Sequence, residues 1–422
     1  MLSKSDRFDV SHWTDRRGHR EWLTQQADAL FDFFDPAFVD PAGGFLDLDR
    51  TGTPAGPEMQ VHALHTTARA VHCFAIGSLL GRPVAPDVVD HGLRTLWERH
   101  RDQTRGGYFW SFAKEQAIDD TKQGYGHAFV LLAAASARIA GHPLADRVLA
   151  DVSDVLDRYF WEETHGAIAE EFTADWRPID GGTYRGQNSN MHLTEALMAA
   201  YEATGETEYL NKAIRIAERV INQAARSRGW RVAEHFLADW TIVDDYSHDN
   251  AMLRPSGTTP GHWFEWSRLL LQLWVISGQG YPWMPEAAQA LFRNAMAYGW
   301  DADNGGYYYT LDWQNRPLRR EKLWWPAAEA AAAAHALNAL CPHSDWEAAY
   351  RQTWDLIEGH YIDSKYGGWH EELSEDLRPA FSIFPGKSDL YHALQACLTP
   401  LFPVEGTLTR AIQNHLFSEI SS

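Results

Sequence analysis

Two histidines follow helix-starting signals, which places their imidazoles at the N-terminal ends of two helices. Thr259 suits an N-cap and Pro260 suits the first helical position, so His262 is expected in the first turn. Asp389 suits an N-cap in the same way and puts His392 at a similar depth in another helix. The positive end of a helix favours the neutral imidazole, which is the form that removes a proton near neutral pH.

A third histidine, His192, follows a similar polar stretch in which Ser189 or Asn190 would act as the N-cap. We therefore expect the three histidines in equivalent first turns of three helices. Any one of them alone is explained more simply as a buried residue with a satisfied hydrogen bond. Three at matching positions instead indicate one acid–base site.

Two further charged residues lie close to these helix starts. Glu265 lies three residues after His262 on the same helical face, where it would bond an imidazole or a hydroxyl group of a ligand. This pair could also hold a metal ion, but no HExxH motif or dense carboxylate cluster completes such a site, so a site without cofactor is favoured. Arg69 lies in an apolar helix start and needs an oxygen-rich partner, which is either a ligand or a buried carboxylate such as Glu58.

The elements that position these side chains recur six times along the chain. Each copy has an amphipathic run, a glycine turn with an apolar residue, a polar stretch and then a run rich in Ala and Leu. The apolar turn residues are spaced by 60 to 63 residues apart from one interval of 77, and a fixed period indicates a repeat architecture. They are Phe45, Tyr108, Ile168, Trp230, Tyr307 and Trp369.

Each repeat is predicted to contain two helices joined by a short β-hairpin. The first helices keep a charged face, as is typical of helices at a surface. They are expected at 21–34, 88–100, 145–161, 209–225, 285–300 and 345–361. The second helices, for example 127–140 and 326–340, are apolar on nearly all sides and are expected to be buried.

Twelve such helices form an all-α (α/α)6 barrel, with the second helices as the inner ring and the hairpins around one rim. The alternating residues 307–313 illustrate a hairpin strand, which ends in a turn at Gln314 and Asn315. The repeat runs from end to end without a linker, so residues 1–422 are expected to form a single catalytic domain. The long interval contains an insertion at 244–257, which is either a lid or specificity loop or a solvated excursion.

Composition excludes several classes of partner. The net charge of −20, from 57 acidic and 37 basic residues, disfavours nucleic acid and anionic membranes. No segment has the length of a signal peptide core or a membrane span, so we expect a cytoplasmic protein. Cys73, Cys341 and Cys397 are too few and too dispersed for a disulfide framework and are expected to pack in the interior. A homo-oligomer is left open.

These segments together resemble the N-acylglucosamine 2-epimerase superfamily, and most closely its branch of aldose–ketose isomerases that act on mannose and related hexoses. The resemblance covers nearly the whole chain. Its most specific stretches are 122–125, 185–192, 231–236, 259–266, 325–330 and 386–392. It implies an (α/α)6 barrel that acts on a free monosaccharide without a metal ion or nucleotide.

The resemblance also implies roles for individual residues. His392 would remove the C2 proton of the open-chain sugar, and His262 would be a second acid–base group used in ring opening. A cage of hydrogen bonds around the substrate and its aromatic walls would come from Arg69, His192, Asn188, Glu265, Asp389, Trp325 and Tyr125. His65 stands where the pattern of this branch suggests an aromatic wall, and it would add a hydrogen bond to a hydroxyl instead.

The chemistry implied is the interconversion of D-mannose and D-fructose, or of related pairs such as D-lyxose and D-xylulose, through a cis-enediolate. Abstraction of a weakly acidic C2 proton needs a base within hydrogen-bond reach and donors aimed at the developing enediolate oxygen. One imidazole that returns the proton to C1 gives isomerisation. A second acid on the opposite face of C2 gives epimerisation.

Three alternatives remain at this point. A 2-epimerase acting on glucose or mannose, N-acylglucosamine or cellobiose would use nearly the same residues. An (α/α)6 glycoside hydrolase would need two carboxylates, for which the hairpins offer Glu170, Glu171, Glu234, Glu371 and Glu372. Such a hydrolase has no need for three imidazoles. A sugar-binding protein without activity on the same scaffold is the third.

Overall fold

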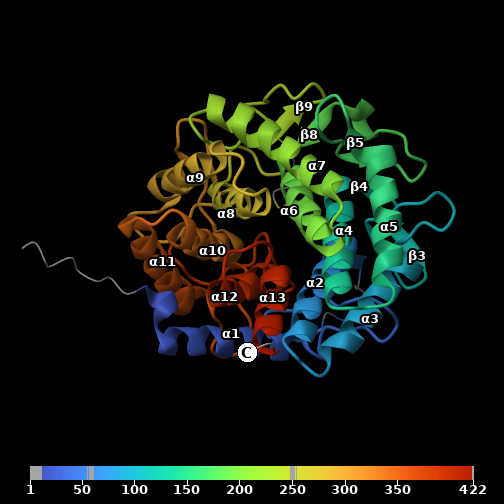
Figure 1. Ribbon diagram of the computed structural model, residues 1–422, viewed down its shortest axis with the longest axis horizontal. Helices are drawn as coiled ribbons and strands as arrows, with labels where there is room; N and C mark the ends of the chain where they lie inside the picture. Colours follow the sequence, from blue (N-terminus) through green and yellow to red (C-terminus); the bar gives the residue numbers. More distant parts are fainter. Residues whose placement is uncertain (1–11, 55, 57–60, 248–251, 253, 421–422) are drawn as a thin grey trace, which may run out of the picture.

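The computed structural model describes residues 12–54, 56, 61–247, 252 and 254–420. Glu58 and part of the 244–257 insertion lie outside these residues, and so do both ends of the chain. The described helices form two concentric rings around a central axis (Figure 1). This arrangement confirms the predicted all-α (α/α)6 barrel.

The inner ring contains the second helix of each repeat. These helices are α2 (Leu64–Leu79), α4 (Gly124–Ile139), α6 (Gln187–Thr204), α8 (Pro260–Ile276), α10 (Trp324–Leu340) and α12 (Tyr391–Leu398). They are buried on nearly all sides, as their composition predicts. In α10 the run from Trp324 to Ala334 is buried throughout, because alanine favours the helix and its small side chain lets neighbouring helices approach closely.

The outer ring contains the first helix of each repeat. These helices are α1 (Arg17–Phe34), α3 (Ala85–Thr95), α5 (Ala145–Val155), α7 (Thr207–Ala217), α9 (Trp283–Gly299) and α11 (Ser344–Leu356). Four of them continue as wider π-helical turns, namely η2 (Leu96–His100), η3 (Leu156–Phe160), η5 (Glu218–Ala225) and η6 (Ile357–Tyr361). With these turns included, the predicted outer runs are confirmed.

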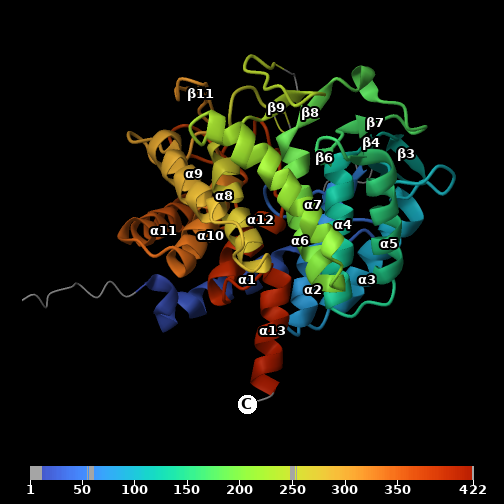
Figure 2. The ribbon, with the colours of Figure 1, turned by 45° about the horizontal axis from the view of Figure 1, so that its top comes forward.

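The glycine turns connect the outer helices to the strands at one end of the barrel. Gly107 shows why glycine is needed, since its φ is +72° and a Cβ atom there would lie 2.7 Å from the ring of Trp176. The predicted hairpin after Tyr307 is present as β10 (Thr310–Leu311) and β11 (Pro317–Arg319), with Asn315 at a φ of +62° in the turn. Figure 2 shows the labelled strands, β11 among them, at one end of the barrel.

Most strand pairs join successive repeats, which the sequence analysis did not predict. The strand that precedes an inner helix pairs with a strand after the glycine turn of the next repeat. The antiparallel pairs are β1 (His62–Ala63) with β2 (Ser111–Ala113), β4 (Lys122–Gln123) with β7 (Glu171–Phe172), β8 (Tyr184–Gly186) with β9 (His235–Leu237), and β12 (Lys322–Leu323) with β13 (Glu372–Leu373). Backbone N of Lys387 donates to O of Leu48 at 2.9 Å and closes the ring between the last and first repeats.

Two other short strand pairs lie within single repeats. Strand β3 (Gln116–Asp119) forms a hairpin with β2, and β5 (Trp161–Glu162) pairs with β6 (Ala167–Ile168). Short 3₁₀ turns lie at η1 (Trp13–Asp15), η4 (Ile179–Gly182) and η7 (Thr399–Leu401).

A buried lysine–aspartate pair recurs in three repeats and fixes the start of the inner helix against its own glycine turn. The lysine lies just before the inner helix, and its Nζ also donates to a carbonyl oxygen of the turn. The pairs are Lys122 with Asp102 at 3.0 Å, Lys322 with Asp301 at 2.6 Å, and Lys387 with Asp363 at 2.6 Å. A buried charge of this kind requires its partner, so each pair sets the position of one helix start.

A thirteenth α-helix, α13 (Leu408–Ile420), was not part of the predicted set of twelve. It lies at the end of the barrel opposite the strands, and part of it extends beyond the rings (Figure 2). The side-chain amide of Gln413 donates to the carbonyl oxygen of Ile139 at 3.0 Å, at the C-terminal end of α4. Thus α13 covers the end of the barrel that the strands leave open.

Two expectations from composition can be compared with the described residues. Within them, every helix is too short or too polar to cross a membrane. The three cysteines are free thiols, with Cys73 and Cys397 buried and Cys341 half-buried.

Candidate active site

Side chains from the first turns of the inner helices converge at the strand end of the barrel. The second residue of each inner helix other than α8 contributes to the site, since the repeats place these positions at the same depth. These residues are His65, Tyr125, Asn188, Trp325 and His392. In α8 the second residue is Gly261, where a Cβ atom would lie 2.4 Å from the ring of Trp325, and His262 follows as the third.

The predicted position of His192 is wrong by one turn. Helix α6 begins at Gln187 after Gly186, because strand β8 ends there, so neither Ser189 nor Asn190 is the N-cap. The side-chain amide of Asn190 instead binds the backbone of the neighbouring glycine turn, and its Oδ1 accepts from N of Ile168 at 2.9 Å. His192 is therefore the sixth residue of its helix.

A second layer of the site is formed by the sixth residues of the inner helices. One helical turn separates this layer from the first, because residues four apart lie on the same helical face. The polar members of the layer are Arg69, His192, Glu265 and Glu329. The site is therefore built as two rings of side chains around the barrel axis.

The two other predicted helix starts agree more closely with the structure. Helix α8 has Thr259 as its N-cap residue and Pro260 at its first position, as predicted, although the Thr259 side chain makes no capping bond. Helix α12 begins at Tyr391, one residue later than an N-cap at Asp389 implies. Oδ2 of Asp389 still accepts from N of His392 at 3.2 Å and so performs the capping role.

One cavity brings the predicted residues together. All of the predicted site residues except Asp389 line it, namely His65, Arg69, Tyr125, Asn188, His192, His262, Glu265, Trp325 and His392. Trp324, Tyr309 and Phe384 add aromatic walls that the sequence analysis did not assign, and Met252 and Pro255 of the insertion lie at the same cavity.

His262 and His392 each bind a carboxylate through the same ring nitrogen. Nδ1 of His262 lies 2.8 Å from Oε2 of Glu234, and Nδ1 of His392 lies 3.0 Å from Oε1 of Glu329. A carboxylate only accepts hydrogen bonds, so each Nδ1 carries the proton and each Nε2 keeps a free lone pair. The amide Nε2 of Gln187 also lies 2.9 Å from Nδ1 of His262, and it donates to the same Glu234 oxygen at 2.8 Å. Each imidazole is thereby fixed in the tautomer that can act as a base at Nε2.

Both carboxylates are held in the ionised form. Burial opposes this, but Arg268 and His392 lower the pKa of Glu329 to about 2. Against the same burial, the contact with His262 lowers the pKa of Glu234. Trp325 contacts both imidazoles, with ring centroids 4.9 Å from His262 and 5.9 Å from His392, so the two bases face one space.

Arg69 and Asp389 form a buried ion pair at one side of the cavity. Nη1 of Arg69 donates to Oδ1 of Asp389 at 3.0 Å, and Nη2 donates to the Tyr125 hydroxyl at 2.8 Å. The guanidinium also lies over the ring of Phe129, 4.4 Å from its centroid. Arg69 therefore has a carboxylate partner, which is Asp389, and still lines the cavity.

His65 occupies the wall of the cavity between two aromatic rings. It stacks on Trp110 at 5.0 Å with an angle of 16° between the planes, and its ring meets Tyr125 edge-on at 5.9 Å. Burial lowers the pKa of His65 to about 3, so it is neutral near neutral pH. Its buried Nδ1 has no hydrogen-bond partner among the described residues.

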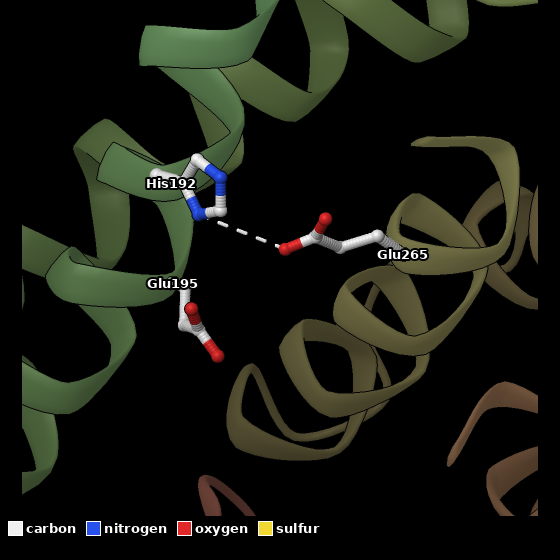
Figure 3. Close-up of side chains that lie close together, drawn as sticks. All are labelled: His192, Glu195 and Glu265. Atoms are coloured by element: carbon white, nitrogen blue, oxygen red, sulfur yellow. Dashed lines mark ion pairs between the residues drawn. The ribbon is translucent and has the colours of Figure 1, made fainter. Parts of the chain in front are cut away.

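His192 and Glu265 face each other in the second layer (Figure 3). Nδ1 of His192 lies 3.6 Å from Oε1 of Glu265, and burial lowers the pKa of His192 well below its ordinary value. With Glu195 they form the one group among the described residues that could hold a metal ion. The guanidinium of Arg268 lies 3.2 Å from Oε1 of Glu195 and 3.7 Å from Oε1 of Glu265, so it supplies the positive charge that such a cluster needs.

The carboxylates that a glycoside hydrolase would use have other partners. None of the five hairpin glutamates lines the cavity with the histidines. Glu234 holds His262, and Glu371 accepts backbone N–H bonds from Ser388 and from Asp389, the latter at 2.7 Å. Ser189 donates to Glu170 at 2.8 Å. Glu170 and Glu171 line a neighbouring cavity together with Arg254. Among the described residues, therefore, none of the five glutamates shares the cavity of the imidazoles.

The insertion reaches the cavity through its described residues. Met252 and Pro255 line the cavity, and the carbonyl oxygen of Pro255 contacts Nε2 of His235 at 2.8 Å. Nη2 of Arg254 lies 3.0 Å from a carboxylate oxygen of Glu171. This part of the insertion therefore contributes to the wall of the site, while 248–251 and 253 lie outside the described residues.

The sequence analysis missed the residues that lie behind the imidazoles. Glu329 is a lone charge in an Ala-rich run, and Arg268 is a lone charge between Trp266 and a run of leucines. A charged residue in such an apolar segment is almost never buried without a charged or polar partner. The sequence therefore indicated that Glu329 and Arg268 have buried partners, without showing which ones. Glu234 was considered only as a hydrolase carboxylate.

The protein is an (α/α)6 barrel with an acid–base site. In this site two imidazoles, each bound to a carboxylate, face one cavity with polar and aromatic walls, which is the kind of cavity that binds carbohydrates. The family model described as N-acylglucosamine 2-epimerase (GlcNAc 2-epimerase) matches residues 43–396. The chain belongs to this family.

Individual relatives extend over nearly the whole chain. It is 41% identical over 412 residues to a protein named D-mannose isomerase from Pseudomonas cannabina pv. alisalensis, covering 95% of this chain and 97% of the relative. A D-mannose isomerase from Thermobifida fusca is 40% identical over 405 residues, covering 95% and 98%. A crystal structure of D-mannose isomerase superposes with a TM-score of 0.84 and 31% identity, covering 90% of this chain and 97% of that one.

Proposed function

We propose that this protein is an aldose–ketose isomerase that interconverts D-mannose and D-fructose. The observation that carries the proposal is the pair of imidazoles, His262 and His392, whose Nδ1 atoms are held by Glu234 and Glu329 while both rings face one cavity. The names of the relatives support mannose as the substrate. Related pairs such as D-lyxose and D-xylulose are further candidate substrates.

In the proposed mechanism His392 is the base at C2. Its Nε2 removes the proton from C2 of the open-chain aldose and returns it to C1, while Glu329 stabilises the imidazolium that forms between the two transfers. His262 assists ring opening as the second acid–base group. Trp325 contacts both rings and keeps them in place around the substrate.

Donors around the same cavity would stabilise the negative charge that develops on the enediolate oxygen. Arg69 and His192 line the cavity next to the imidazoles, and Asn188 presents its side-chain amide from the first turn of α6. Preorganised donors of this kind typically contribute about 3 to 4 kcal/mol to the transition state. Asp389 acts behind the site, since it holds Arg69 and caps the helix of His392.

The proposed reaction needs no metal ion or other cofactor, and the whole ring would work as one catalytic domain because the cavity draws side chains from all six inner helices. We also propose a cytoplasmic enzyme, since three free thiols suit a reducing compartment. Its substrate would be a free monosaccharide.

The test follows D-mannose by NMR in deuterated water, with and without a chelator. We expect D-fructose labelled at C1 wherever the proton held by His392 exchanges with the solvent before its return, formed at a rate that the chelator does not change. Glucose labelled at C2 as the main product would indicate a 2-epimerase, and loss of turnover with chelator would contradict metal independence. Release of reducing sugar from an oligosaccharide, with mannose unchanged, would indicate a hydrolase.

The variant His392→Asn tests the role of the base. It should lower turnover by about 10³-fold or more, because no other group replaces the proton acceptor at C2. Circular dichroism should show an unchanged fold. Unchanged turnover would refute the assignment, and the absence of turnover in the parent protein with a range of aldoses would instead favour a sugar-binding protein.

A further inference from the structure

The proposed isomerisation moves two protons, and the base at C2 accounts for only one of them. Mannose carries a hydrogen on C2 and a hydroxyl proton on O2, whereas fructose carries the corresponding hydrogens on C1 and O1. His392 moves the carbon-bound proton. Another group must move the oxygen-bound proton from O2 to O1, and the inference below rests on the proposed function.

Only a few side chains of the cavity are suited to this transfer. Arg69 keeps its protons in any protein environment and serves as a donor only. His262 and His392 donate through Nδ1 to Glu234 and Glu329, so each has only one free nitrogen, which cannot donate and accept at the same time. Glu265 is the only carboxyl group among the described residues that line the cavity. A carboxyl group can donate from one oxygen and accept at the other, as the transfer requires.

The hydrogen bonds of Arg268 go to two other carboxylates, so Glu265 has only a longer ion-pair contact with this guanidinium. The guanidinium donates through Nε to Oε2 of Glu329 at 2.8 Å and through Nη1 to Oε1 of Glu195 at 3.2 Å. Oε1 of Glu265 lies 3.7 Å from Nη2 of Arg268, beyond hydrogen-bond distance. Both atoms are buried and without a hydrogen-bond partner among the described residues. Of the three neighbouring carboxyl groups, the guanidinium therefore forms hydrogen bonds with those of Glu329 and Glu195 and none with that of Glu265.

Electrostatics favour a protonated Glu265. Burial and the negative charges of Glu329 and Glu195 raise the pKa of Glu265 well above its ordinary value, and they outweigh the opposing effects of Arg268 and Arg69. Two like charges this close in a buried site do not both ionise easily.

The facing histidine does not alter this balance. His192, whose Nδ1 lies 3.6 Å from the Glu265 carboxyl group, has a pKa held well below its ordinary value by burial and by Arg69. It is neutral near neutral pH and provides no positive charge that would ionise Glu265. A neutral acid and a neutral imidazole therefore face each other (Figure 3), and both residues line the cavity.

We propose that Glu265 carries the hydroxyl proton of the sugar from O2 to O1. When His392 takes the C2 proton, the C2–H electron pair forms the C1=C2 bond and the C1=O π pair moves to O1. The Glu265 carboxyl group gives its proton to O1, and the carboxylate then takes the proton from O2. The O2 lone pair forms C2=O as the C1=C2 π pair takes the proton back from His392 at C1, so every proton and electron pair is accounted for.

The test is the variant Glu265→Gln, which keeps the shape of the side chain but cannot exchange a proton between its two ends. With D-mannose in deuterated water, NMR follows two quantities in one sample: D-fructose formed, and deuterium entering C2 of the remaining mannose. We expect fructose formation to fall at least about 100-fold, a typical loss for one acid–base group. Exchange at C2 should fall far less, so the ratio of exchange to isomerisation rises at least tenfold.

Glu347→Gln is the matched control. It makes the same change at another buried glutamate, which does not line the cavity and accepts instead from backbone N of Trp13 at 2.9 Å and from Nε of Arg351 at 2.6 Å. It should leave both processes and their ratio as in the parent protein, and circular dichroism checks the fold of both variants.

The outcomes separate the two proposals. A parallel loss of exchange and isomerisation in Glu265→Gln would overturn the proton transfer and leave a purely positioning role for Glu265. Unchanged fructose formation in this variant would overturn it as well. If the parent protein gives neither fructose nor C2-deuterated mannose, the proposed function itself fails.

Discussion

At the scale of residues, the structure explains how ordinary histidines become directional bases. Each imidazole has one nitrogen bound to a buried carboxylate, which leaves the other nitrogen for the substrate. Glu329 does this for His392 while its second oxygen accepts from Arg268 at 2.8 Å. Its two oxygens thus serve two donors that approach from different helices.

This double role makes Glu329→Gln a stringent variant. A glutamine has a single carbonyl oxygen, so its NH2 group must face either the Nδ1–H of His392 or the guanidinium of Arg268, and both are donors. We expect turnover to fall by about 100-fold or more, because the tautomer and orientation of His392 are lost. Steady-state kinetics of fructose formation would measure it.

Glu375→Gln is the control for that variant. Glu375 forms an exposed ion pair with Arg320 at 2.6 Å, and an exposed pair contributes little. Its activity should therefore match that of the parent protein. Comparable activities for the two variants would contradict the role given to Glu329.

At the scale of elements, the starts of the inner helices act as a shared frame for the site. The same helical position supplies an imidazole, a phenol, an amide or an indole in five repeats, and in the sixth it must be glycine. Gly261 leaves room for Trp325, whose ring lies between its neighbours His262 and His392.

Gly261→Ala tests this frame. The added Cβ would lie 2.4 Å from Trp325, so the indole must move. We expect unfolding free energy to fall by about 1–3 kcal/mol, as in other overpacked cores, and KM for mannose to rise because a wall of the cavity shifts. Denaturant unfolding and steady-state kinetics would measure the two effects.

The matched control is Gly359→Ala in the π-helical turn η6, where an added Cβ meets no atom within 4 Å. Alanine is the better helix former, so this variant should be as stable as the parent or more so, with unchanged KM. Equal KM values for the two variants would show that Trp325 does not depend on Gly261.

At the scale of the whole molecule, the ring is closed at one end by strands that join successive repeats and at the other by α13. The start of α13 is held by Glu202 at the end of α6, whose Oε2 accepts from N of Thr407 at 3.0 Å and also from its hydroxyl. Burial raises the pKa of Glu202 to about 7. We therefore expect the contact between Glu202 and the start of α13 to depend on pH near neutrality.

The sign of this effect follows from linkage. An acid with a raised pKa in the folded state stabilises the protein while protonated, so its contribution is present below its ordinary pKa and is lost as pH rises through about 7. Glu202→Gln stays neutral and should reduce the fall in Tm between about pH 5 and about pH 8. Thermal melts at both pH values would measure it, with the exposed Glu358→Gln as control. An equal fall in Tm in Glu202→Gln and the parent would contradict the assignment.

The sequence alone determined the six repeats, the two classes of helix and the barrel, because period and amphipathicity are local properties of the chain. It also predicted nine of the residues that line the cavity, since repeat equivalence places them at matching depths, but not the walls Trp324, Tyr309 and Phe384. The roles that the family resemblance implies for these residues stay predictions. The sequence misplaced His192, because the start of α6 is set by a strand pairing with the next repeat.

Only the tertiary structure decided which groups act on the imidazoles. Glu234 reaches His262 across 28 residues of sequence, Glu329 reaches His392 across 63, and Arg268 lies 61 from Glu329. No local pattern records such pairings, because they depend on how the closed ring turns each helix about its own axis. These distant contacts determine which groups of the site carry a proton. The proposed role of Glu265 depends on them as well.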